Sequence, residues 1–78
     1  MRRVLVVDDH APSRAHLVRT LTQSGYEIVG EGVSGKKALV IARTAKPEII
    51  IMAIGLPDMD GIDAAREVMR LQPLPIVC

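Results

Sequence analysis

Two adjacent carboxylates, Asp8 and Asp9, directly follow the apolar run Val4–Val7 near the start of the chain. Neighbouring acids repel each other unless a cation or solvent separates their charges, and Mg²⁺ prefers oxygen ligands. The pair therefore predicts a magnesium site. The alternative interpretation is a solvated acidic turn that caps the following helix.

A second segment that could carry reactive residues runs from Glu48 to Gly61. It reads as a buried strand that opens into a loop rich in Gly, Pro and Asp, which is a common position for a reactive side chain. A third carboxylate at this strand end, close to Asp8 and Asp9, would make a phosphate acceptor. Position 53 is an alanine, so that carboxylate is missing.

The elements that must position these residues alternate between apolar runs and amphipathic stretches. We predict strands at about 3–8, 26–32, 48–53 and 74–78, and helices at about 12–24, 34–46 and 62–71. Single helices between strands indicate right-handed crossovers and a doubly wound parallel α/β sheet. Active crevices of such folds lie at the carboxyl ends of the strands, so Asp8, Asp9 and Ala53 should meet if the first and third strands are neighbours.

The residue patterns also predict which side chains are buried. The strand at 26–32 carries Glu27 and Glu31 and is expected at an edge of the sheet, whereas the strand at 48–53 should be covered on both faces. The predicted core-facing residues of the second and third helices are Ala38, Ile41, Ala42 and Ala45, and Ile62, Ala65, Val68 and Met69.

Composition narrows the class of protein. The 78 residues are expected to form one small domain, 1–78, whose apolar content is aliphatic except for Tyr26. A net charge of +1 gives no electrostatic footprint for nucleic acid. The single cysteine, Cys78, indicates a reducing compartment and is predicted to be a buried strand thiol. The first apolar run is too short for a signal peptide or a membrane span, so we expect a cytoplasmic protein without a membrane partner.

Three segments together carry a resemblance to a known family: Val4–His10, the strand at 48–53 and the loop Gly55–Gly61. In order and spacing they resemble the CheY-like receiver domain of two-component response regulators over the whole chain. The Asp-Asp-His form and the Gly-Leu-Pro-Asp-Met-Asp-Gly loop are most similar to receivers joined to a LuxR/NarL-type helix-turn-helix domain. The resemblance implies a flavodoxin-like fold with strand order 2-1-3-4.

The resemblance also implies roles for individual residues. Asp8 and Asp9 match the acidic pair that holds Mg²⁺, and Gly55 would offer its backbone carbonyl to the metal. Ala53 occupies the position of the aspartate that accepts phosphate from a sensor kinase, while Pro57 and Gly61 shape the loop. A methyl group has no nucleophilic oxygen, so we expect no phosphorylation at position 53, only weak Mg²⁺ binding and no catalytic residues: a phosphorelay signalling module rather than an enzyme.

Partners follow from the same resemblance: a sensor histidine kinase, a second receiver copy in a dimer or segment exchange, and DNA only through a missing output domain that regulates transcription. We expect the chain to be incomplete at its C-terminal end, truncated before the fourth helix and fifth strand, with a sheet edge that invites pairing. Ala53 is either natural or a deliberate replacement, and we favour the latter because Asp8, Asp9, Asp58 and Asp60 remain.

Other interpretations stay open. A magnesium-dependent phosphotransfer or phosphohydrolase enzyme could use Asp8 as its nucleophile, although such enzymes generally have an acid where this chain has His10. A phosphorylation-independent dimerisation module is a further possibility. The segment Gly30–Lys37 matches the phosphate-binding pattern G-x-x-x-x-G-K, but Lys37 replaces the required Ser or Thr, so a helix start at Ser34 is favoured. His10 is expected at the mouth of the acidic site and His16 on the surface.

Overall fold

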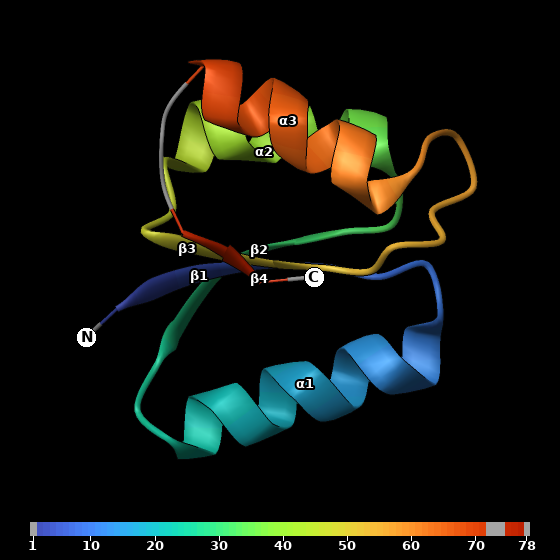
Figure 1. Ribbon diagram of the computed structural model, residues 1–78. Coiled ribbons are helices and arrows are strands. Elements are labelled where there is room, and N and C mark those ends of the chain that lie inside the picture. The colour runs from blue at the N-terminus through green and yellow to red at the C-terminus, as the bar shows by residue number, and fades with distance from the viewer. Residues whose placement is uncertain (1, 72–74, 78) are drawn as a thin grey trace.

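The computed structural model describes residues 2–71 and 75–77. The elements in chain order are β1 (Arg3–Val7), α1 (Ala11–Gln23), β2 (Glu27–Gly32), α2 (Gly35–Ala45), β3 (Ile49–Met52), α3 (Gly61–Leu71) and β4 (Ile76–Val77). The four strands form one parallel sheet in the order β2-β1-β3-β4. Figure 1 shows α2 and α3 on one face of this sheet and α1 on the other. The predicted α/β fold and strand order are confirmed.

The main core lies between the sheet and the helix pair α2 and α3. Its buried residues are Leu5, Val7, Ile50 and Met52 from the sheet, Ala38 and Ala42 from α2, Ala64 and Val68 from α3, and Leu56 from the loop after β3. Alternate residues of β1 and β3 belong to this core, as the period of two requires. Each fully buried Val, Leu, Ile or Met side chain contributes roughly 1.5–3 kcal/mol to folding.

The opposite face of the sheet is only partly covered. Val4 and Val6 are fully buried on this face, but Ile49 and Ile51 are half-buried. The reason is that α1 packs on β1 and β2 and lies away from β3. The expectation that both faces of the third strand are covered is therefore wrong for this face.

The third helix is present as predicted, but its buried face differs from the predicted one. Ala64 and Val68 are buried and Ala65 is half-buried, whereas Ile62 and Met69 are 49% and 46% exposed. Small residues at 61 and 64 let α3 approach the end of β3 and the neighbouring helix α2 closely, which turns Ile62 and Met69 outward. The prediction that these two side chains face the core is wrong.

Helix α2 is held at its limits by identifiable side chains. Ser34 caps its N-terminus and accepts a hydrogen bond from the Lys37 backbone amide at 3.2 Å. Its C-cap, Lys46, has a φ of 48°, a left-handed conformation that ends the helix before Pro47. The Arg3 guanidinium donates to the carbonyl oxygens of Ala45 at 2.6 Å and Lys46 at 2.9 Å. The helix therefore begins and ends where the sequence predicted.

The pairing of β1 with β2 contains one irregularity. Val4 lies opposite Ile28 and Leu5 lies opposite Gly30, so Val29 is an extra residue in β2. At Gly30 a β-carbon would overlap the side chain of Ile41, which explains the glycine. With β1 as its one neighbour in the four-stranded sheet, β2 is the edge strand that its mixed sequence predicted.

The fourth strand is described only at Ile76 and Val77, which pair with Ile50 and Ile51. Leu74 and Cys78, with the predicted burial of the cysteine thiol, lie outside the described residues. Among the helices of the described part of the chain, none is long and apolar enough to cross a membrane.

Candidate functional site

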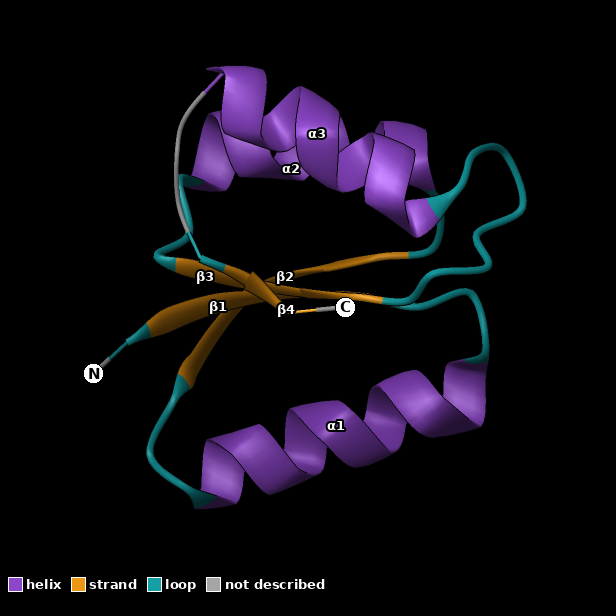
Figure 2. Ribbon diagram, viewed as in Figure 1, coloured by secondary structure: helices purple, strands orange, loops and turns teal. Residues whose placement is uncertain are grey.

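The acid pair and the loop after β3 lie at the same edge of the sheet. In Figure 2 the loops that leave β1 and β3 emerge side by side at the carboxyl ends of the strands. Val7 is paired with Met52, and the Ala53 amide donates to the Val7 carbonyl at 2.9 Å. One step further in this register, Asp8 lies beside Ala53 at the spacing of neighbouring strands, about 4.8 Å.

The two acids differ in their surroundings. Asp8 is half-buried, and its carboxylate accepts a hydrogen bond from the His10 amide at 2.9 Å, while Asp9 is exposed. The Asp8 carbonyl accepts from the Arg14 guanidinium at 2.8 Å. The N-cap of α1 is His10, whose ring Nδ1 accepts from the Ser13 amide at 3.3 Å. The alternative interpretation of the acids as a helix cap is therefore wrong, because the histidine fills that role.

The loop after β3 folds tightly back on the strand that it leaves. Gly55 and Asp60 form an antiparallel bridge, and the Gly61 amide donates to the Ile54 carbonyl. A β-carbon at position 61 would overlap the Ala53 carbonyl and the Ile54 α-carbon. Asp60 then caps α3, since its carboxylate accepts from the Ile62 amide at 2.7 Å. Position 61 therefore requires a glycine, because any larger residue would clash with the backbone at Ala53, just after β3.

The possible ligands at this edge are of the type that magnesium prefers, but they are few. Asp8, Asp9 and the Gly55 carbonyl offer only oxygen atoms, which are the ligands that Mg²⁺ prefers. Within the described residues, no group of three or more His, Cys, Asp or Glu side chains is close enough to hold a metal ion. A carboxylate at position 53 would be the third acid of this edge, because the Ala53 amide donates to the carbonyl of Val7, the residue directly before Asp8.

Asp58 has a role that the sequence analysis missed. Its carboxylate reaches the N-terminus of α2, where Oδ1 accepts from the Gly35 amide at 2.8 Å and Oδ2 from the Lys36 amide at 3.0 Å. These two hydrogen bonds hold the pKa of Asp58 below its ordinary range. One signal was available in the sequence: the first turn of α2 contains no acidic residue, although a helix N-terminus favours negative charge.

The same contact removes the phosphate-loop interpretation of Gly30–Lys37. A phosphate-binding loop needs unpaired amides at the start of its helix. The Gly35 and Lys36 amides donate to Asp58, the Lys37 amide to the Ser34 hydroxyl, and the Ala38 amide to the Ser34 carbonyl. The first four amide groups of α2 are therefore occupied by the protein itself.

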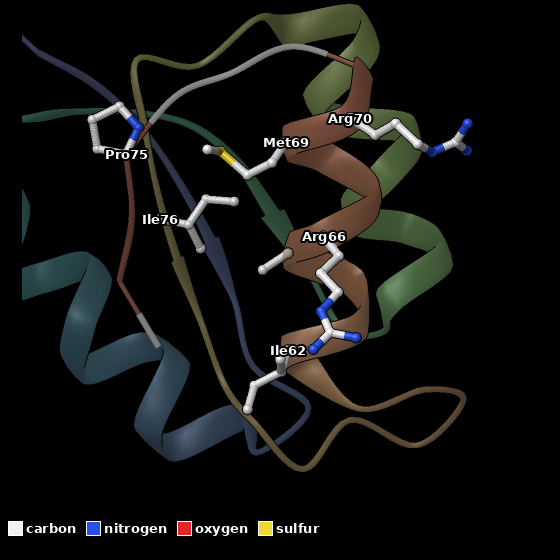
Figure 3. A pocket seen from close by; sticks show the side chains of 7 residues that line it. Ile62, Arg66, Met69, Arg70, Pro75 and Ile76 are labelled. Carbon is white, nitrogen blue, oxygen red and sulfur yellow. The ribbon is translucent and has the colours of Figure 1, made fainter.

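A groove lies apart from the acidic edge, between α3 and β4. It is lined by Ile62, Ala65, Arg66, Met69, Arg70, Pro75 and Ile76. Figure 3 shows Met69 and Ile76 projecting toward each other across the groove, whereas Arg70 points away. Arg70 is paired with Glu67 at 2.6 Å. With no carboxylate among its lining residues, the groove is not part of the candidate metal site.

Comparison with known proteins decides the family. The sequence profile of the response regulator receiver domain matches residues 4–78, which is nearly the whole chain. This chain belongs to the response regulator receiver domain family. Receiver domains are signalling modules rather than enzymes, and they generally bind Mg²⁺ at the acceptor site.

Two relatives are longer than this chain, which matches part of each. It is 43% identical over 72 residues to the chemotaxis protein CheY of Thermotoga maritima, covering 92% of this chain and 60% of CheY. It is 45% identical over 76 residues to the transcriptional regulatory protein PdtaR of Mycobacterium tuberculosis, covering 97% of this chain and 37% of PdtaR. The chain thus spans from about a third to three fifths of the length of these relatives.

Solved receiver structures have the same fold. The response regulator domain of Thermotoga maritima CheB superposes with a TM-score of 0.91 at 35% identity, covering 97% of this chain and 57% of that one. A LuxR-family two-component response regulator from Aurantimonas sp. superposes with a TM-score of 0.92 at 29% identity, covering 97% and 56%. The described strand order and helix placement are therefore those of a receiver domain.

Proposed function

We propose that this receiver belongs to a DNA-binding response regulator and that Ala53 prevents it from accepting phosphate. The observation that carries the proposal is the register of β1 and β3, in which Ala53 lies beside Asp8 at the carboxyl edge of the sheet. A carboxylate at this position would be the nucleophile toward a phosphoryl group, and a methyl group cannot take its place.

In this proposal Asp8, Asp9 and the Gly55 carbonyl hold Mg²⁺. When bound, the ion would neutralise charge on an incoming phosphoryl group. The protein contributes the position of these oxygens: the His10 amide orients the Asp8 carboxylate, and the bridge to Asp60 orients Gly55. With two carboxylates instead of three, the affinity for Mg²⁺ is expected to be low.

The proposed partners are a sensor histidine kinase, a second receiver copy and an output domain that contacts DNA. The likeness to the transcriptional regulator PdtaR and to a LuxR-family regulator supports the output domain. The net charge of +1 supports assigning DNA contact to that domain rather than to these residues. Related receivers do form complexes, since PhyR has been solved with the anti-sigma factor NepR and CheY with CheX.

The decisive experiment restores the acid. Ala53→Asp in the full chain, treated with acetyl phosphate and Mg²⁺, is expected to give a covalent phosphate adduct that hydroxylamine removes. The unaltered chain and Ala53→Asn, which has the same shape as the aspartate variant but no nucleophilic oxygen, should give none. A folded Ala53→Asp protein that stays unmodified would overturn the proposal, and so would an equal adduct in all three proteins.

A further inference from the structure

The contact between Asp58 and α2 joins two parts of the molecule that the chain separates by more than 20 residues. Both carboxylate oxygens are used, one on the Gly35 amide and one on the Lys36 amide. Hydrogen bonds to an ionised acceptor are roughly twice as strong as those between neutral groups. The positive end of the helix dipole adds to this attraction, and so does the neighbouring Lys36 charge.

Packing at the same place supports the contact independently. Gly35 is buried, and a β-carbon there would overlap the side chain of Met59, the residue after Asp58. The loop therefore lies directly against the start of α2 through an apolar side chain as well as through the carboxylate. A larger residue at the first position of the helix would force the Met59 side chain to move away from α2.

The loop has little freedom to absorb a change at this contact. The two ends of the loop are joined by the antiparallel bridge between Gly55 and Asp60. At the end of the loop, Gly61 packs so closely against the Ala53 carbonyl that no β-carbon would fit. The Leu56 and Gly61 amides both donate to the Ile54 carbonyl. A displacement of Asp58 must therefore be transmitted to the segment that carries the Gly55 carbonyl.

We propose that Asp58 is a positioning residue that couples the N-terminus of α2 to the geometry of the loop carrying Gly55, and through it to metal affinity at the Asp8 and Asp9 edge. The metal part of this inference rests on the proposed function above. The coupling is reciprocal: whatever tightens the loop must also tighten the α2 contact, and the reverse.

The test uses the full chain with Ala53→Asp as the parent, and Asp58→Ala and Asp58→Asn on that background. Asp63→Asn is the matched control, because Asp63 is an exposed acid in the first turn of α3 that pairs with Arg66 at 3.9 Å within its own helix. Amide hydrogen exchange and Mg²⁺ titration, both followed by NMR, are the measurements.

Asp58→Ala is expected to speed exchange at the Gly35 and Lys36 amides on the order of tenfold, the factor that one hydrogen bond to a charged group represents. It should also speed exchange at Leu56 and Gly61 and weaken Mg²⁺ binding by roughly tenfold, the lower end for residues that support metal ligands. Asp58→Asn keeps one acceptor oxygen, so its exchange rates and Mg²⁺ affinity should lie between those of the parent and Asp58→Ala. The exchange rates and Mg²⁺ affinity of Asp63→Asn should equal those of the parent.

A purely structural role for Asp58 would not produce the reciprocal effect: Mg²⁺ added to the parent should slow exchange at Gly35 and Lys36. The inference is wrong if exchange at these two amides rises in Asp58→Ala while Leu56, Gly61 and the Mg²⁺ affinity stay unchanged. If the parent itself binds no Mg²⁺, the proposed metal edge fails, and exchange at Leu56 and Gly61 alone decides whether Asp58 positions the loop. If Asp58→Ala does not fold, Asp58→Asn decides the same questions.

Discussion

At the scale of single residues, the glycines of the loop after β3 meet opposite steric conditions. A β-carbon at Gly61 would overlap the backbone of Ala53 and Ile54, whereas one at Gly55 would meet no atom within 4 Å. Gly61→Ala is therefore expected to lower the free energy of unfolding by about 1–3 kcal/mol, the range for overpacked positions. Urea unfolding measures this loss.

Gly55→Ala is the matched control for that experiment, since it adds the same methyl group to the same loop. Its free energy of unfolding should stay within about 0.5 kcal/mol of the parent. Equal losses in the two variants would mean that loop flexibility, and not the contact at Ala53, sets the requirement for glycine.

Position 53 gives a second prediction at this scale. An aspartate there would lie beside the half-buried Asp8, so two like charges would face each other at one strand end. Ala53→Asp should therefore unfold at a lower temperature than the unaltered chain in EDTA. Mg²⁺ should raise the melting temperature of Ala53→Asp more than that of the unaltered chain, with about 2.7 kcal/mol gained at 100 times its dissociation constant.

At the scale of elements, α2 is held at both ends by side chains from elsewhere in the chain. The Asp58 carboxylate lies at its N-terminus and the Arg3 guanidinium at its C-terminus. Each charge has the opposite sign to the dipole charge at that end of the helix, so both interactions are favourable. Arg3→Gln is expected to cost about 1–2 kcal/mol of unfolding free energy. Arg2→Gln, at an exposed position next to it, should cost much less in the same urea titration.

The lowered pKa of Asp58 predicts a pH dependence for this element. Because the pKa is lower in the folded protein, the contact stabilises the fold fully above the ordinary aspartate pKa of about 3.9, and this stabilisation is lost as pH falls through the folded pKa. The stability difference between the parent and Asp58→Asn should therefore be largest near neutral pH and shrink below about pH 4. Urea unfolding at several pH values measures it, and a constant difference would contradict the assignment.

Local signals in the sequence were enough to predict the helices, but not how the helices face their neighbours. Ser34 and Pro47 define the limits of α2 because capping and proline geometry act within a few residues. The buried stripe of α3 depends instead on which side meets α2 and β3. Ile62 shares the spacing i, i+3 and i+7 with Ala65 and Met69, whereas Val68 lies on the face of Ala64, four residues before it. The close approach of Gly61 to the end of β3 favours burial of the second face. Asp58 escaped prediction for the same reason, since its partners lie on another helix.

At the scale of the whole molecule, the sheet has an exposed apolar border. Val77 in β4 is 57% exposed, and its neighbour Ile51 in β3 is half-buried. In the part of the chain that the structure describes, no strand pairs with the outer edge of β4. Exposed strand edges with apolar side chains favour pairing between molecules, so this 78-residue chain is expected to self-associate as its concentration rises.

A charge on that edge should oppose the association. Val77→Lys is expected to shift the sedimentation profile toward the monomer. Val40→Lys is the control, because Val40 on α2 is also 57% exposed and the change in charge and side-chain size is identical. If both variants dissociate equally, net charge and not the β4 edge is responsible.

The sequence patterns predicted a parallel α/β sheet, because single helices between apolar strands leave few other arrangements, while the strand order followed from the resemblance to receiver domains. The patterns placed Asp8, Asp9 and position 53 at strand ends, and these residues meet because β1 and β3 are neighbours. They overestimated the cover on β3, since a pattern of consecutive apolar residues does not reveal how far α1 extends across the sheet. Ile49 and Ile51 are half-buried for that reason.

The extra residue in β2, Val29, sets the register in which the rest of β2 pairs with β1. Val29 lengthens β2 by one position against β1, after which Gly32 lies opposite Val7 and its carbonyl accepts from the Asp8 amide at 3.0 Å. Deleting Val29 would draw the start of α2 back by one strand position, about 3.3 Å. That is further than the hydrogen bonds from Gly35 and Lys36 to Asp58 can stretch. Val29 therefore sets the position of the N-terminus of α2 relative to Asp58, although it lies far from Asp58 in the chain.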